Sequence, residues 1–431
     1  MIDVNAACRS FRALLGVLAI LGIAGSAAAQ APGGLERSAT LRAEDVLPPA
    51  LLRGPHHTVD PTVHVYSLMR EYRVQSEFGS YVVVGDARLR ILVRELSAIA
   101  ELRRVKRGAA FVEASANAVA GTVRGARNLV EDPVGTLSGV PEAAADIFGR
   151  IGEQLNRGRR SRYEDGSAKA LLSVSSFKRD LARSLGVDVY STNELLQKEL
   201  NSVAWASAAG NLSLGALSMA TGAAALQVAG YVRVLDQAKE VIASEPPAEI
   251  SRRSRASLTA MAMPKDVIDR FLAHRSYSPR HQYLIVSSLQ VMDKVADRRR
   301  LLDAALLAQS EAEAHLFQQT AEMMAAYHQI VQPLGRISAD WGFPVGVLPR
   351  GKVVVLAPVD YVLWSDPAVG FFARLPARAA RAQVERRGGS PAAPHGEVWI
   401  SGDASPRARD EIARLGYALH VRSGDRLPLA D

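Results

Sequence analysis

Residues 200–232 form a run of thirty-three residues without a charged side chain, bounded by Glu199 and Arg233. Charged residues make up 22% of the whole chain, so this gap is its sharpest change in character. The run is long enough to cross a bilayer, which takes about 20 apolar residues. Its large aliphatic residues are few, however, and its Gly, Ser and Asn residues oppose insertion into lipid. We therefore expect a buried small-residue helix or helical pair, with a membrane-spanning helix and conditional membrane insertion as alternatives.

Helical periodicity flanks this run on both sides. Between residues 87 and 105, apolar residues recur at steps of three and four, which is typical of an amphipathic helix. Residues 282–332 contain neither Gly nor Pro, so they would form one helix of roughly 75 Å or a hairpin broken near residues 298–300. These segments predict a mainly α fold, a helical bundle with long amphipathic helices packed on the uncharged run.

A β-hairpin is expected at residues 63–85, ahead of the helices. Val and Tyr residues recur there at every second position, and Gly79 supplies a turn between two such stretches. Alternation at period two is the pattern of a half-buried strand. The helical bundle would therefore open with a short antiparallel pair.

The last part of the chain predicts a small α/β unit of the β–α–β type. Residues 397–401 and 417–421 read as strands. Between them, Ser405 is placed to cap a helix that begins at Pro406 and stops at Gly416, which is the expected arrangement of cap, proline and glycine. Strands joined by such a helix are parallel, with a right-handed crossover, by default.

The first residues resemble a secretory signal peptide. Two Arg precede an apolar stretch at residues 13–24, and small residues at 26–29 fit a cleavage site. An N-terminal membrane anchor is the alternative, although the apolar stretch is short for a bilayer. Cys8, the only cysteine of the chain, lies in this segment, so the mature chain would contain no disulfide and no thiolate site.

These boundaries predict four segments. They are a signal peptide at 1–29, an extended or disordered leader at 30–62, a helical domain at 63–335 that opens with the hairpin and centres on 200–232, and a small α/β domain at 336–431 with a linker near 376–395.

A metal site is one candidate, at His56, His57, Asp60 and His64. Imidazole and carboxylate groups are common zinc ligands. The spacing matches no metal motif, so the alternative is a polar approach to the first strand.

An anion or ligand site is a second candidate, at Ser401, Gly402, Asp403 and Ser405. They follow a strand and precede a helix, where α/β folds bind ligands and where helix N–H groups favour an anion. The same residues serve equally as a turn and a helix cap.

A third group, Glu311, His315 and Glu322, falls near one face of a helix. Two carboxylates and an imidazole could bind a metal or move protons. Solvated or ion-paired side chains are the alternative.

Net charge bears on the partners. The formal charge is +8, and removal of the signal peptide, with its two Arg and one Asp, leaves +7. The Arg clusters could attract anionic lipid headgroups or acidic glycans, or they are solvated helix faces. Nucleic acid is not expected, because the chain is predicted to be exported and the clusters lack interleaved aromatic residues.

The sequence therefore predicts an exported protein of the periplasm or cell envelope of a Gram-negative bacterium, or a secreted one. Its expected role is non-enzymatic, by helical packing against a membrane surface or an envelope protein, and no cofactor is expected. A periplasmic enzyme, for example a metal-dependent hydrolase, and a secreted membrane-inserting factor are the alternatives. The small-molecule ligand, if any, is not predicted.

Overall fold

The computed structural model describes six stretches of the chain, namely residues 34–66, 68–108, 169–210, 231–340, 343–375 and 396–430. The predicted signal peptide and the predicted linker near 376–395 lie outside these residues, and the uncharged run is described only at its two ends, 200–210 and 231–232. The chain divides into two compact units: Met1–Arg90, Gln227–Lys239 and Arg253–Asp431 form the first, and Ile91–Leu226 and Glu240–Arg252 form the second.

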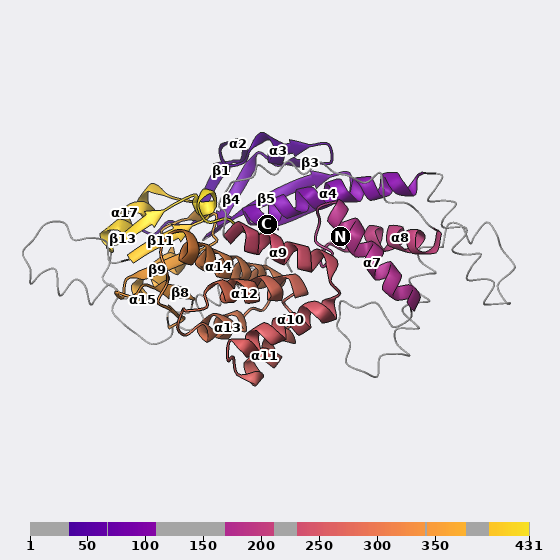
Figure 1. Cartoon of the computed structure of the whole chain (residues 1–431). Helices are drawn as coiled ribbons and strands as arrows, with labels where there is room; N and C mark the ends of the chain where they lie inside the picture. Colours follow the sequence, from indigo (N-terminus) through magenta and orange to yellow (C-terminus); the bar gives the residue numbers. More distant parts are fainter. Residues whose placement is uncertain are drawn as a thin grey trace, which may run out of the picture. The chain divides into compact units, whose positions relative to one another are not determined.

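An antiparallel six-stranded sheet opens the first unit (Figure 1). Its strands run in the order β1, β4, β5, β3, β2, with β6 also paired to β5. Two short helices, α2 (Ala43–Val46) and α3 (Pro49–Leu52), connect the first strands. The strands are β1 (Ala39–Arg42), β2 (Arg53–Gly54), β3 (His57–Val59), β4 (Thr62–Tyr66), β5 (Met69–Ser76) and β6 (Gly79–Val84).

The longest antiparallel pair of this sheet, β5 with β6, is a hairpin that turns just before Gly79. Gly79 has a φ of +135°, a conformation that an L side chain rarely adopts. Alternate residues of β4 and β5 are fully buried, among them Val63, Val65, Tyr72 and Val74. The period-two pattern seen in the sequence is therefore the inward face of a sheet.

A mixed five-stranded sheet lies at the end of the chain, in the order β13, β11, β9, β8, β7. Its strands are β7 (Arg336–Ser338), β8 (Val345–Val347), β9 (Val353–Ala357), β11 (Gly396–Ile400) and β13 (Tyr417–His420). Strands β9, β11 and β13 are parallel, whereas β7 and β8 are antiparallel. A third, two-stranded sheet pairs β10 (Tyr361–Val362) with β12 (Asp403–Ala404).

Helix α17 (Pro406–Arg414) connects β11 to β13, which gives a parallel β–α–β unit. Ser405 caps the helix, since its side chain accepts the N–H of Ala408. Gly416 has a φ of +83° just after the helix end. The helix cap, the proline and the glycine are thus at the positions where the sequence predicted the start and end of this helix.

The mainly α prediction is wrong, because the described residues form three sheets rather than a helical bundle with long amphipathic helices. Strands β1 to β3 are two to four residues long, too short for a period to show in the sequence. Strands β7 and β8 are three residues each, with every residue of β8 buried. From the sequence alone, such short buried strands are predicted as loops.

The Gly- and Pro-free stretch 282–332 forms three helices rather than one or two: α12 (Pro279–Val291), α13 (Arg299–Ala305) and α14 (Glu311–Ile330). The first break includes Asp297, whose φ is +57°. At the second break, Ser310 caps α14 by accepting the N–H of Glu313. Helix α14 packs against α12 and is buried over most of its length, so it is a core helix of this unit.

The other helices of the chain include two that pack together in the second unit, α7 (Lys169–Ser184) and α8 (Glu194–Gly210). There the carboxylate of Glu199 accepts from Arg103 and Lys106 at 3.0 Å each. The further helices are α4 (Asp86–Lys106), α9 (Tyr231–Ser244), α10 (Pro247–Ala260), α11 (Lys265–Leu272) and α15 (Asp366–Arg374). No helix among the described residues is long and apolar enough to span a bilayer.

Gly402 allows the closest approach of two backbone segments in the C-terminal region. A Cβ atom at this position would lie 1.8 Å from the carbonyl oxygen of Asp360. We expect Gly402→Ala to lower the free energy of unfolding by about 3 kcal/mol, because backbone atoms must move to relieve the overlap. Gly370→Ala is the matched control in α15, where a Cβ would meet nothing within 4 Å. It should be neutral or stabilising, by about 0.5–1 kcal/mol. Urea unfolding of both variants measures the difference, and equal stabilities would contradict the close approach.

Candidate functional site

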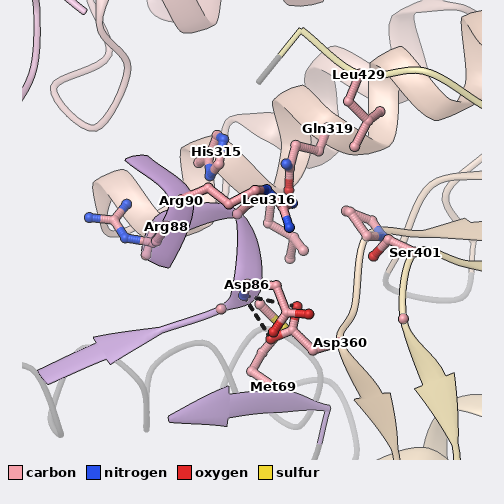
Figure 2. Close-up of a pocket in the computed structure, with 15 residues that line it drawn as sticks. Met69, Asp86, Arg88, Arg90, His315, Leu316, Gln319, Asp360, Ser401 and Leu429 are labelled. Carbon is pink, nitrogen blue, oxygen red and sulfur yellow. Dashed lines mark hydrogen bonds between the residues drawn. The ribbon is translucent and has the colours of Figure 1, made fainter. Parts of the chain in front are cut away.

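A cavity of about 90 Å³ lies at the carboxyl ends of the parallel strands β9 and β11. Asp360 stands three residues beyond β9, and Ser401 and Gly402 directly follow β11. Ligands of parallel α/β sheets bind outside these strand ends. The remaining walls come mainly from the start of α4 and from one side of α14 (Figure 2). We call this space the carboxylate cavity, after Asp86 and Asp360, which both line it.

The carboxyl group of Asp360 is buried and held by backbone donors. Its Oδ2 accepts the N–H of Arg70 at 3.0 Å, and both its oxygens lie 3.2 Å from the backbone nitrogen of Asp86, which donates to them. Burial and the neighbouring Asp86 carboxylate raise the pKa of Asp360 to about 7 and outweigh the backbone donors and the Arg70 charge. Asp360 therefore changes protonation state near neutral pH.

Asp86, at the start of α4, is held differently. Its Oδ2 accepts from Nη1 of Arg70 at 2.7 Å, and its Oδ1 accepts the hydroxyl of Tyr72 at 2.5 Å. Arg70 and Tyr72 stand two residues apart on β5, so they share one face of the strand. Burial, followed by the Asp86 charge, raises the pKa of Tyr72 far above its usual value, so this hydroxyl keeps its proton. The Asp86 carboxylate thus has one fixed cation and one fixed hydroxyl as partners.

Helix α14 supplies buried polar groups to the opposite wall. His315 and Gln319 are one turn apart on the helix, are each 6% exposed, and both line the cavity. Figure 2 shows them across the cavity from the two aspartates. This wall therefore presents an imidazole and an amide to any ligand in the cavity.

A cluster of charged residues lies at the start of α14. Arg88 of α4 forms an ion pair with Glu311, and Nε2 of His281 lies 3.6 Å from the other oxygen of that carboxylate. Burial would raise the pKa of Glu311, but the Arg88 guanidinium and the imidazoles of His281 and His315 together lower it. Because Arg88 is paired in this way, its charge is largely compensated at the cavity.

Acid–base chemistry requires two carboxyl groups in unlike environments. One group can then hold a proton at neutral pH, because the charge of the other raises its pKa. The arrangement can transfer a proton to or from a ligand in the cavity. Among the described residues, no group of three or more His, Cys, Asp or Glu could hold a metal ion.

The predicted anion site divides between two places. Ser401 and Gly402 line the carboxylate cavity, whereas Asp403 binds Arg409 and Arg422. Ser405 stands at the N-terminus of α17, where the chain already supplies an anion. The Oε2 atom of Glu36 accepts the Ser405 hydroxyl at 2.7 Å and the backbone N–H of Trp364 at 2.6 Å.

The predicted metal residues are not brought together. His56 contacts Glu77, and Nε2 of the buried His57 lies 3.1 Å from the carbonyl oxygen of Leu51. Strand β5 stands between β3, which carries His57, and β4, which carries His64. Two strand spacings, about 9.6 Å, exceed the span of one metal site. Asp60 follows β3, and its N–H bonds the carbonyl of Arg73.

The third predicted group also separates. His315 lines the carboxylate cavity, whereas Glu311 forms an ion pair with Arg88, which also lines it. Glu322 is fully buried further along α14, where it accepts from Gln318 at 2.9 Å and from the backbone N–H of Ala430 at 2.9 Å.

Asp360, Asp86, Arg70 and Tyr72 were not expected as site residues from the sequence. One signal for Asp360 was present: an aspartate shortly after a buried run of valines, at the point where a parallel strand ends. Asp86 and Arg70 carry no such signal, because only the tertiary fold brings them to that strand end.

No family model, curated protein or solved structure matches the chain. The function is therefore argued from the geometry of the cavity.

We expect Asp360→Asn to remove one specific pH dependence of stability. Between about pH 4 and pH 7 the unfolded chain has ionised Asp360, whereas the folded chain retains the proton. Folding takes up a proton in this window, so the free energy of unfolding falls as pH rises through it, by on the order of 4 kcal/mol from this residue. Asn keeps an oxygen for the N–H groups of Arg70 and Asp86 but does not titrate.

Urea unfolding of the wild type and Asp360→Asn at several pH values measures this effect. The difference in stability between the two proteins should shift in favour of Asn from pH 4 to pH 7 and stay level above. A difference that is constant with pH would show that Asp360 does not retain its proton.

Proposed function

We propose that the chain is an exported hydrolase of small polar substrates, with the carboxylate cavity as its active site. The observation that carries this proposal is the buried carboxyl group of Asp360, with a pKa of about 7, beside a second carboxylate at the ends of parallel strands. A strongly shifted pKa in a cleft is the physical mark of a catalytic acid or base. The export part rests on the predicted signal peptide.

In the proposed step, protonated Asp360 donates its proton to the leaving oxygen or nitrogen of the substrate while the bond to that atom breaks. Water adds to the electrophilic carbon or phosphorus, and one of its protons returns to the Asp360 carboxylate. Asp86 raises the proton affinity of Asp360, and Arg70 and Tyr72 fix Asp86 in place. His315 and Gln319 offer hydrogen bonds that orient the substrate. A space of about 90 Å³ admits only the reacting end of a substrate.

The first test is a screen of chromogenic esters, amides, phosphates and glycosides with the full chain. We expect an activity that Asp360→Asn lowers about a hundredfold or more, the usual share of a general acid or base. Its pH profile in the wild type should have an inflection near pH 7 that the variant lacks. Asp425→Asn, at an exposed position, is the matched control and should leave activity unchanged. An activity that is insensitive to Asp360→Asn would place catalysis elsewhere.

A second test needs no substrate. A small epoxide such as propylene oxide reacts when a carboxylate attacks its carbon and a neighbouring acid protonates the oxygen as the ring opens. Asp360 is the acid in this reaction, so we expect a hydroxyester on Asp86, located by peptide mass mapping. Asp360→Asn should abolish the label, because the proton donor is gone. Labelling at exposed carboxylates only would mean that this pair is not accessible to substrate.

A further inference from the structure

A second cavity, of about 80 Å³, lies on the other side of the segment that carries Asp360. Residues of this segment alternate between the two spaces: Pro358 and Asp360 line the carboxylate cavity, and Ala357 and Val359 line the second. Its other walls come mainly from β9, β11, α14 and α15 and are apolar except for Glu313. They include four aromatic side chains, Phe317, Phe343, Phe371 and Phe372. We call this space the apolar cavity.

One charged residue, Glu313, lines the apolar cavity, and its exposed fraction is only 1%. Its Oε2 accepts the backbone N–H of Gln309 at 2.8 Å. Its Oε1 is buried and has no hydrogen-bond partner among the described residues. A buried oxygen of this kind that lacks a donor costs about 1–3 kcal/mol or more. The helix-capping role of Glu313 requires only one of the two oxygens.

The volume and lining of the cavity decide what kind of molecule is complementary to it. A buried water needs two to four polar partners, and Glu313 is the single polar residue among those that line this cavity. An apolar cavity of about 150 Å³ holds benzene, so half that volume is too small for an aromatic ring. A saturated chain of about two carbons fits better, because with its head atom it has about half the heavy atoms of benzene. Its head should carry one donor, because one acceptor oxygen is unsatisfied.

We propose that the apolar cavity is a binding site for a short aliphatic alcohol, with its hydroxyl group donating to Oε1 of Glu313. An ammonium head would leave two of its three donors without partners, and a carboxylate head has no donor for Oε1 of Glu313. A hydroxyl group has one donor and so matches the single free oxygen. This site does not depend on the proposed hydrolysis, because it lies on the opposite side of the segment 357–360.

Two isomers test the site in the full chain. Ethanol and dimethyl ether have the same atoms, but only the alcohol has a donor. We expect ethanol to bind at least tenfold more tightly, by NMR titration, because the hydrogen bond to a carboxylate is worth about ten- to hundredfold in Kd. Equal affinities, or no binding of either isomer, would overturn the proposal.

Two variants locate the binding. In Glu313→Gln the amide oxygen can still accept from Gln309, and the amide N–H group then replaces Oε1. Both isomers can accept from it, so the preference for the alcohol should disappear; an unchanged preference would overturn the proposal. Glu77→Gln, at an exposed position, is the matched control and should keep the preference.

Ala368→Leu is the second variant, because Ala368 is buried and lines the cavity. The added side chain should fill the space and abolish binding of both isomers. Ala413→Leu, at an exposed position of α17, is its control. Binding that survives Ala368→Leu would place the alcohol elsewhere.

Discussion

The bonds around Asp360 tie together parts of the first unit that are far apart in sequence. Its carboxyl group accepts the N–H groups of Arg70 and Asp86, which precede it by 290 and 274 positions. Its own N–H donates to the carbonyl of Leu68, and its carbonyl accepts the N–H of Asp403. The N-terminal sheet, the end of β9 and the turn after β11 thus meet at one residue. Contacts of such long sequence separation form only when most of this unit has folded.

This junction lowers the stability of the folded chain, because the carboxyl group of Asp360 is buried beside a second carboxylate. An amide of the same shape would offer an acceptor to the same N–H groups without the charge, and neutral replacements of buried charges are often stabilising. Packing alone therefore does not account for an aspartate here. The property that distinguishes Asp360 is a carboxyl group that gains or loses its proton near neutral pH. We therefore place the proposed function in the cavity that Asp360 lines.

Local signals predicted local structure well and tertiary structure poorly. The cap at Ser405 and the turn at Gly79 depend on a few neighbouring residues, and the structure has both where the sequence indicated. Strands β11 and β13 of the five-stranded sheet were predicted as a parallel pair, but β7 and β8 were missed because strands of three residues show no period. Of the candidate site residues, Ser401 and Gly402 line the carboxylate cavity at the end of β11. The acidic pair was out of reach, because Asp86 and Asp360 meet only through the fold. Export and an envelope role stay predictions.

Helix α14 explains why two unlike cavities exist side by side. Its successive turns present His315 and Gln319 to the carboxylate cavity, and Glu313 and Phe317 to the apolar cavity. Leu316, between these two faces, lines both spaces. The residues of segment 357–360 also alternate between the two cavities, with a period of two. Helix α14 and this extended segment therefore separate a polar space from an apolar one. Because α14 is buried along most of its length, neither wall can shift without repacking the core, and both sets of side chains are held in fixed positions.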